Sequence, residues 1–440
     1  MNMERLTISS TTSWNLCTAC GICKGICSKE AISWEKKNGH YLPVIDETAC
    51  VKCGLCAAVC PGLTHDYGEG WENKESGVKG RVLATYNAWS CDPTLRHVSA
   101  SGGVVSTLIG TLLRTGNYDA AFVVRGYDYH EQLTTSLASA KDLEDLSGSN
   151  IPKSRYLPVS HENAVSFIRA NRDKKVIIIG SGCAVRGLQK AIQALHLNRE
   201  NYLMIGLFCD RVFTYRVMDY FGSEHFCGNS HLENLHFKNK ESGGWPGNMK
   251  FFLSDGSAQY WDKSERTKAK DLFMPERCLY CVDKLNASAD ISLGDNYTQQ
   301  DSSPLGSNSV IIRTSRGLTA WEMVSDQLEF CPVDLELIWK AQYVDWRLNN
   351  LCYAELKEKE IKKECKREIV LNKGLSSRCY ISDYEWRRER SLEMMHIGEL
   401  FASEPEKLFH NLHLLEEKDR QGGSGYLARL KRFVLRKLKG

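Results

Sequence analysis

The sequence lacks any apolar segment long enough to cross a membrane. Its most apolar runs, GGVVSTLIGTLL and KVIIIG, are far shorter than the roughly 20 residues that a bilayer-spanning helix needs. The N-terminal stretch MNMERLTISSTTSWN has no apolar core of signal-peptide length. These absences predict a cytoplasmic protein.

The sequence also lacks a strong excess of charge of either sign. Its 57 Lys and Arg residues nearly balance 54 Asp and Glu residues, for a net charge of +3, which gives no reason to expect a nucleic-acid partner. Charged residues make up 25% and hydrophobic residues 42% of the chain, as in ordinary globular proteins. A chain of 440 residues corresponds to roughly three domains at about 150 residues each.

Cysteine, in contrast, is abundant, with 18 residues. In a reducing compartment this abundance indicates metal or redox use and not a disulfide framework. Two runs, WNLCTACGICKGIC and CVKCGLCAAVCP, share the spacing C-x2-C-x2-C-x3-C, and no other repeat is present. This spacing is typical of two-cluster bacterial ferredoxins, in which the fourth cysteine of each run ligates the other cluster. Gly21 and Gly54 would let the backbone turn tightly beside each cluster.

We therefore predict two [4Fe-4S] clusters, one held by Cys17, Cys20, Cys23 and Cys60, the other by Cys50, Cys53, Cys56 and Cys27. The alternatives are zinc and unpaired core thiols, but zinc sites usually separate their C-x2-C pairs by a dozen residues or more. One departure is Ser28, which follows Cys27 where a proline is usual; it removes no ligand. Two neighbouring clusters conduct single electrons but do no substrate chemistry by themselves.

Four further cysteines could meet at one sheet edge. KKVIIIGSGCAVRGLQKAIQAL predicts a strand, a glycine turn and a helix, and YLMIGLFCDRV predicts another strand. Cys183 and Cys209 each follow the carboxyl end of their strand; if the strands are parallel in one sheet, both thiols lie where open α/β sheets bind ligands. RCLYCVDKLNASADISLGDNY adds Cys278 and Cys281. The alternatives are buried free thiols for the first two, and zinc or no metal for the C-x2-C pair.

A glycine-rich turn opens a predicted helix near residue 104. Apolar residues at positions 104, 105, 108, 109, 112 and 113 form a helical stripe, which follows Ser101, Gly102 and Gly103. Bare N–H groups at such a terminus attract a phosphate or another anion; the alternative is a Ser N-cap on a buried helix, with glycines for close packing. The loop ESGGWPG contains Gly244 and Trp245 and is either a turn anchored by an aromatic residue or a ring-stacking site.

The C-terminal part changes character from about residue 320, where long polar helical segments predict solvated faces. The last segment, GYLARLKRFVLRKLKG, places apolar residues on one helical face and basic residues on the other. This pattern is typical of a helix that lies on an anionic membrane surface. The alternative is a basic tail that packs on the protein or frays in solvent.

The chain resembles the family of coenzyme F-420 hydrogenase/dehydrogenase beta subunits, which also includes 7-hydroxymethyl chlorophyll a reductase and the beta subunits of some formate dehydrogenases. The resemblance rests on six motifs in the family's order: SASGGVVSTL, KSRYLPV, GSGCAVRGL, GLFCDRV, ESGGWPG and RCLYCVDKLNASADISLGDNY. It covers residues 81–320, and a preceding ferredoxin module is a familiar arrangement in this family. One departure is GSGCAVRGL, which lacks the family's Pro before the cysteine and Gln after it.

The resemblance implies a flavoprotein that holds FAD and receives electrons from iron–sulfur clusters. It implies flavin contacts at Ser101, Gly102, Gly103, Lys153, Ser154, Arg155 and Tyr156. We also expect Gly244, Trp245 and Asp295 to bind the cofactor. It also implies a third [4Fe-4S] cluster on Cys183, Cys209, Cys278 and Cys281. No catalytic acid or base emerges: Asp283, Lys284 and His97 lie near motifs, but we expect structural or cofactor-binding roles for them.

We accordingly expect an α+β protein with five parts. These are a small two-cluster ferredoxin-like domain (1–66), a linker (67–80), a larger mixed α/β flavin-binding core (81–320), a helical region (321–423) and a basic amphipathic tail (424–440). The tail is a candidate for peripheral contact with the inner face of the membrane.

The expected function is that of a reductase. Electrons from a donor such as a ferredoxin or a partner dehydrogenase pass through the clusters to FAD, then to an organic acceptor or a deazaflavin-type carrier. A flavin is needed because clusters pass one electron at a time, whereas most organic reductions need two. One alternative is a non-catalytic electron-transfer subunit of a larger complex. The basic tail resembles that of bacterial family members associated with surface-polysaccharide synthesis. Another alternative is a membrane-associated scaffold that keeps its clusters for structure.

Overall fold

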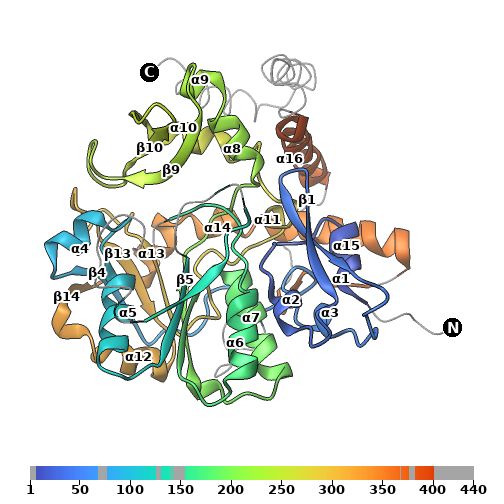
Figure 1. Ribbon diagram of the computed structural model, residues 1–440, viewed down its shortest axis with the longest axis horizontal. Coiled ribbons are helices and arrows are strands. Elements are labelled where there is room, and N and C mark those ends of the chain that lie inside the picture. The colour runs from blue at the N-terminus through green and yellow to red at the C-terminus, as the bar shows by residue number, and fades with distance from the viewer. Residues whose placement is uncertain are drawn as a thin grey trace.

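A computed structural model describes most of the chain (Figure 1). The described residues are 6–67, 77–124, 129, 131–139, 141, 154–366, 368–375 and 382–400. The predictions for Lys153, for most of the 67–80 linker and for the 424–440 tail therefore lie outside the described residues.

The N-terminal domain is built on the two cysteine runs. It contains α1 (Ile8–Ser13), α2 (Ile22–Ile26), the antiparallel pair β1 (Ile32–Lys37) and β2 (His40–Ile45), and α3 (Leu55–Ala58). Gly21 and Gly54 cap α2 and α3 with φ values of 72° and 78°, which L-residues with a side chain rarely adopt. The tight turns expected beside Cys20 and Cys53 are therefore present.

The core is an eight-stranded sheet in the order β14-β4-β13-β12-β8-β7-β5-β6. In chain order its strands are β4 (Ala84–Ser90), β5 (Ala120–Val124), β6 (Thr135–Ala138), β7 (Val176–Gly180), β8 (Tyr202–Leu207), β12 (Ile291–Asp295), β13 (Asn308–Ile312) and β14 (Leu328–Pro332). The neighbours β5, β7, β8 and β12 are parallel, whereas β6, β13 and β14 run antiparallel to their neighbours. Strands such as VIIIG are apolar at nearly every position because both faces of the sheet are covered.

Helices cover the two faces of this sheet. On one face α5 (Val104–Arg114) and α12 (Ser315–Glu322) pack on alternate strand residues such as Ile177 and Leu203. On the other, α6 (Glu162–Ala170) and α7 (Gly182–Ala194) pack on Ile178 and Met204. Ile22 and Ile26 of α2 join this second cluster, so the ferredoxin-like domain packs directly on α6 and α7 (Figure 1). Short connections are α4 (Pro93–Val98), α11 (Glu276–Leu279) and the 3-10 turns Arg199–Asn201 and Ser325–Gln327.

A smaller layer is inserted between β8 and β12. It consists of an antiparallel sheet, β9 (Leu232–Asn239), β10 (Asn248–Leu253) and β11 (Ala258–Trp261), with α8 (Arg216–Phe221), α9 (Glu224–Cys227) and α10 (Lys263–Ala269). Its core is rich in aromatic residues, among them Phe221, Phe237 and Phe251. This layer lies beyond one edge of the large sheet (Figure 1).

The C-terminal region wraps back onto both domains. Its first strand, β14, is an edge strand of the large sheet. The boundary expected at residue 320 therefore falls between β13 and β14, which belong to the same sheet. It continues with α13 (Leu335–Ala341), α14 (Val344–Arg347), α15 (Asn350–Cys365) and α16 (Ser382–Leu400). Between them β15 (Asn372–Lys373) pairs in parallel with β3 (His65–Asp66) of the ferredoxin-like domain. The expected α+β class, with a small ferredoxin-type domain before a larger mixed core, is confirmed. No helix among the described residues has the length and apolar character needed to span a bilayer.

Candidate metal and cofactor site

Four cysteines of the core meet at the carboxyl edge of the large sheet. β7 and β8 are parallel neighbours in which Gly180 pairs with Gly206, so the two thiols that follow them share one edge, as expected. Cys183 lies in the first turn of α7 and Cys209 two residues beyond β8. Cys278 of α11 and Cys281 line the same cavity, which has a volume of about 350 Å³, within the range of about 300–1,000 Å³ for ligand pockets.

The four thiols lie close enough together to affect one another's pKa values. Burial raises the pKa of Cys183 to about 12, and the nearby Cys20, Cys281 and Cys278 add to the shift. Burial, then Cys278, Cys183 and Cys281, raise the pKa of Cys209 well above its usual value. Thiols crowded in this way stay protonated unless positive charge is brought among them, which is what a bound metal centre supplies.

Cationic side chains surround this group of thiols. Asp210 faces Lys284 at 3.1 Å, Lys270 at 3.2 Å, Arg211 at 3.4 Å and Arg347 at 3.8 Å. Four cations thus face one carboxylate, whose pKa lies well below its usual value because these charges outweigh the effect of burial. Arg347 of α14 is buried and donates a hydrogen bond to the carbonyl of Cys278 at 3.1 Å. Burial raises the pKa values of Cys209 and Cys278, and the positive charge of Arg347 opposes this rise.

The first cysteine run lies beside this group. Burial raises the pKa values of Cys17, Cys20 and Cys23, and Cys60 of the second run is among the other causes in each case. Cys60 therefore lies with the first three cysteines, in agreement with a crosswise ligand set. Cys20 also lines the cavity, so the first run and the core cysteines are direct neighbours.

The second run is closer to the surface. Cys53 is exposed, and the pKa of Cys56 is raised by burial and then by the nearby Cys53 and Cys50. Within the described part of the chain, no three His, Cys, Asp or Glu side chains are close enough to bind a single metal ion. A cubane differs from such a site because each of its four irons takes one cysteine, so its ligands stand further apart.

The ferredoxin-like domain is fixed to the core by specific contacts. Glu162 of α6 accepts hydrogen bonds from Lys24 at 2.8 Å and from the Trp34 indole at 2.6 Å. The backbone N–H of His161 donates to the carbonyl of Cys20 at 2.8 Å. A Cβ on Gly25 would lie 2.6 Å from the carbonyl oxygen of Glu162. The spacing between Cys20 and the core cysteines is therefore set by closely packed backbone.

The amino end of α5 opens onto the same cavity. Gly103 caps the helix with φ 84° and no side-chain hydrogen bond, and Ser101, Gly103 and Ser106 line the cavity. The Ser101 hydroxyl donates to the carbonyl of Ser307 at 2.7 Å, so it is not an N-cap. A Cβ on Gly102 would lie 2.8 Å from the carbonyl oxygen of Ala88. Close packing thus accounts for this glycine, while Val104, Val105 and Ser106 in the first turn of α5 line the cavity.

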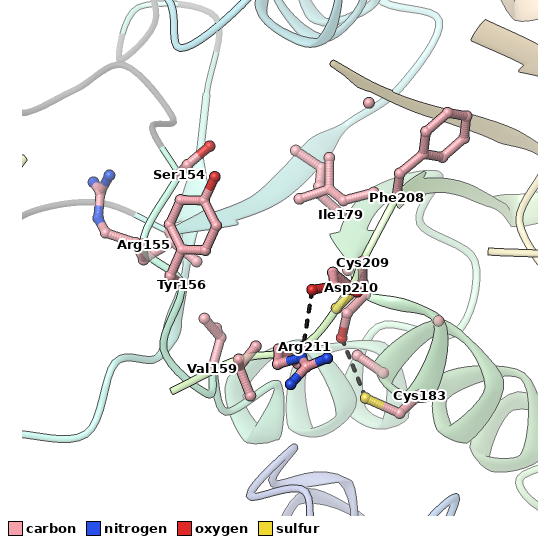
Figure 2. A pocket seen from close by; sticks show the side chains of 18 of the residues that line it. Ser154, Arg155, Tyr156, Val159, Ile179, Cys183, Phe208, Cys209, Asp210 and Arg211 are labelled. Atoms are coloured by element: carbon pink, nitrogen blue, oxygen red, sulfur yellow. Dashed lines mark hydrogen bonds and ion pairs between the residues drawn. The ribbon is translucent and has the colours of Figure 1, made fainter. Parts of the chain in front are cut away.

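Other predicted flavin contacts divide into two groups. Ser154, Arg155, Tyr156 and Asp295 line the cavity, and Ser154 and Tyr156 stand on the wall opposite Phe208 and Cys209 (Figure 2). Gly244 and Trp245 are not among the described residues that line it. The Trp245 indole instead donates to Asp295 at 3.4 Å and lies against Tyr297, with ring centroids 5.4 Å apart. Of the two roles considered for this loop, the aromatic anchor describes its contacts best.

Some residues of the site carried no signal in the sequence, and others lay near motifs without a specific assigned role. Lys238 of β9 lines the cavity and forms a buried ion pair with Asp295. His65 and Asp283, both buried, approach to 3.3 Å at the junction between the domains. Lys284 donates a hydrogen bond to Asp210, which is consistent with a structural role. His97 is exposed on α4. Lys238 lies just before the ESGGWPG loop and Arg347 lies beyond the last motif. Neither belongs to a motif, so only the fold could identify them.

The sheet order arranges these groups along one edge. From β4 to β7, the cavity is lined first by the start of α5, then by Asn308 of β13 and Asp295 of β12, and finally by Cys209 and Cys183. The cavity thus has a polar end at the helix terminus and a sulfur end at β8 and β7. This edge is where open α/β sheets bind ligands.

Models of known protein families match both domains of the chain. Residues 85–165 match the N-terminal part, and residues 173–336 the C-terminal part, of the family described as "Coenzyme F420 hydrogenase/dehydrogenase, beta subunit". Residues 16–62 match a "4Fe-4S dicluster domain".

The chain is also similar to individual proteins. A subunit of the F(420)H(2) dehydrogenase of Methanosarcina mazei is 23% identical over 334 residues, which cover 73% of this chain and 86% of that protein. A chain of the F420-reducing [NiFe] hydrogenase complex from Methanosarcina barkeri, solved after xenon derivatization, is 20% identical. It aligns with a TM-score of 0.48 over 66% of this chain and 96% of its own length.

The family matches confirm the resemblance found in the sequence motifs, and they extend it to residue 336. The dicluster match covers all eight cysteines of the two N-terminal runs. The chain therefore belongs to the family of coenzyme F420 hydrogenase/dehydrogenase beta subunits, which are parts of oxidoreductases, and carries an N-terminal domain for two [4Fe-4S] clusters.

Proposed function

We propose that this chain is an iron–sulfur flavoprotein that carries electrons through three [4Fe-4S] clusters to one FAD and on to an organic acceptor. The two N-terminal clusters take the ligand sets predicted from the sequence. The third takes Cys183, Cys209, Cys278 and Cys281. We also propose the sequence-derived division into a ferredoxin-like domain, a flavin-binding core and a C-terminal region.

One observation carries the proposal: a single cavity is lined both by cysteines and by a helix terminus. Its sulfur end brings Cys20 of the first run together with the four core cysteines. Its polar end presents the amino end of α5, where N–H groups favour a phosphate. A redox cofactor with a phosphate-bearing arm could therefore lie along the edge, with its ring toward the sulfur.

The residues present fit these groups chemically. Four thiols among a surplus of cations suit a centre that carries net negative charge when its ligands are thiolates. Apolar side chains such as Val104, Ile179 and Leu293 line the cavity between its polar groups, as is usual for cofactor sites with a few placed polar groups. When bound, a flavin would convert single electrons into a two-electron reduction. Ser154 and Tyr156 would contact it from the wall opposite Cys209.

The test is anaerobic purification of the full chain, followed by counts of iron, sulfide and flavin. We expect about twelve irons per chain, four per cubane, and one FAD. About eight irons would show that the third cluster is absent, and absence of flavin would refute the reductase function. The Cys209→Ser variant should lose about four irons while the N-terminal clusters remain.

A second candidate is a relay subunit that does no chemistry of its own. It is favoured by the relative from Methanosarcina mazei, which is named as a subunit of a dehydrogenase. In that case the partner would be another subunit of an oxidoreductase complex, and the acceptor a deazaflavin-type carrier. Reduced chain that passes electrons to an organic acceptor only after a partner is added would favour this candidate.

A further inference from the structure

Between the sulfur end and the α5 terminus, one charged pair faces the cavity. Lys238 reaches across from β9 and pairs with Asp295, the last residue of β12; their side chains are only 4% and 15% exposed. Both residues line the cavity. A buried ion pair gives little net stability, so its placement at a largely apolar cavity calls for a chemical explanation.

The surroundings of Asp295 keep its carboxylate ionised. Besides Lys238, it accepts hydrogen bonds from the Tyr297 hydroxyl at 3.1 Å and from the Trp245 indole at 3.4 Å. These donors outweigh the effect of burial and lower the pKa of Asp295. The backbone carbonyl of Asp295 also accepts a hydrogen bond from the Gln342 side-chain amide at 2.8 Å. The carboxylate is thus a fixed partner that orients the Lys238 ammonium toward the cavity.

The same carboxylate joins the pair to an aromatic surface that reaches solvent. Tyr297 is 45% exposed and lies against Trp245 with an angle of 37° between the rings. Rings in such positions stack on planar conjugated molecules. The Tyr297 hydroxyl and the Lys238 ammonium contact the same Asp295 carboxylate, so a ring stacked on Tyr297 would lie close to Lys238.

We propose that Lys238 is the proton donor for a planar conjugated two-electron acceptor, that Asp295 positions it, and that Tyr297 forms the stacking surface of the acceptor site. This inference rests on the proposed function, because it requires a reduced flavin as the hydride source. It assigns Asp295 to the acceptor and not to the flavin, and Trp245 remains the aromatic anchor that lies against Tyr297.

Reduction of a conjugated acceptor adds one hydride and one proton. When bound, a reduced flavin would supply the hydride, and two electrons from the clusters together with one proton from solvent would restore its reduced form. An N–H bond of the Lys238 ammonium breaks, and the proton forms an N–H or O–H bond on the acceptor. The neutral amine is then reprotonated from solvent.

The test uses the full chain, purified without oxygen, in five forms: wild type, Lys238→Met, Lys238→Arg, Tyr297→Leu and Lys250→Met. Lys250 of β10, the strand next to β9, is the matched control. It forms a lysine–carboxylate pair with Glu241 at 2.5 Å but does not line the cavity. The probes are a 5-deazaflavin and a soluble naphthoquinone, both planar acceptors, and methyl viologen, which takes one electron and no proton.

We expect Lys238→Met to slow reduction of the planar acceptors by about 100-fold, as when a general acid is lost. Viologen reduction, flavin content and equilibrium binding of the oxidised deazaflavin should not change. Lys238→Arg should be equally slow, because a guanidinium keeps its protons. Tyr297→Leu should weaken deazaflavin binding by about 3- to 10-fold, and Lys250→Met should resemble wild type.

Three results would overturn the proposal. Wild-type rates in Lys238→Arg would mean that only the charge matters. Loss of flavin from Lys238→Met would make Lys238 a flavin contact. The wild-type chain could also hold flavin and reduce viologen but reduce neither planar acceptor. This result would show that planar conjugated molecules are not its acceptors. A chain purified with about eight irons or without flavin would instead refute the proposed function, and this inference with it.

Discussion

The contact between the ferredoxin-like domain and α6 can be tested with a single methyl group. Gly25 lies in α2, where alanine would ordinarily be better than glycine by about 0.5–1 kcal/mol. Here, however, a Cβ would lie 2.6 Å from the carbonyl oxygen of Glu162 and 2.7 Å from the Cβ of Val165. Neither atom belongs to the free end of a flexible side chain, so α2 and α6 must move apart.

Overpacking of this kind costs about 1–3 kcal/mol. After the gain in helix propensity is subtracted, we expect Gly25→Ala to destabilise the chain by about 1–2 kcal/mol and to lower its melting temperature by a few degrees. Because α2 carries Cys23 and follows Cys20, the first cluster should also move away from the core cysteines. The magnetic coupling between reduced clusters, measured by electron paramagnetic resonance, should weaken.

Gly110→Ala is the matched control. Gly110 is also a buried helical glycine, but its added Cβ would meet only the mobile end of Arg114, at 3.2 Å. This variant should melt at or above the wild-type temperature. If Gly25→Ala melts as high as wild type with unchanged coupling, the idea that packed backbone fixes the distance between the clusters is wrong.

Three further changes test other parts of the structure. His161 is buried, and burial lowers its pKa to about 4 from 6.5. The unfolded chain therefore binds the extra proton first, and stability should fall as the pH drops from about 6.5 to about 5, by at most about 1.4 kcal/mol per pH unit. Melting temperatures of His161→Gln should depend less on pH in this window, and an equal slope would contradict the assignment. Arg313→Leu should cost about 2–4 kcal/mol in denaturant unfolding, because the buried guanidinium donates to the carbonyls of Lys79, Arg81 and Leu285; a loss below about 1 kcal/mol would refute this role. Deletion of residues 424–440 should release the chain from anionic liposomes, and equal co-sedimentation of both forms would end the proposal of membrane contact.

The sequence predicted those features that depend on local spacing. The cysteine runs, the glycine turns at Gly21 and Gly54, and the helix that begins after Gly103 each follow from neighbouring residues. The shared edge of Cys183 and Cys209 was predicted on the condition that their strands are parallel in one sheet, and β7 and β8 are parallel neighbours.

The sequence did not predict the groups that surround the cysteines. Arg347 reaches Cys278 from 69 residues away, and Lys238 reaches Asp295 across 57 residues. Neither lies in a motif, and lysine and arginine on polar segments usually face solvent. The inserted layer of β9, β10 and β11 was missed for a related reason: it supplies Lys238 only after folding over the cavity.

The pairing of β3 with β15 has a consequence for biosynthesis. His65 and Asp66 close the cysteine-rich domain, yet their strand partner is Asn372 and Lys373. About 300 residues separate the two, so at about 5–20 residues per second the ribosome needs roughly 15–60 s to deliver the partner. During that interval the nascent N-terminal domain has an open edge. Metal assembly factors would then have access to thiols that the finished protein encloses, and a fragment ending near residue 66 should be a poor substitute for the intact chain.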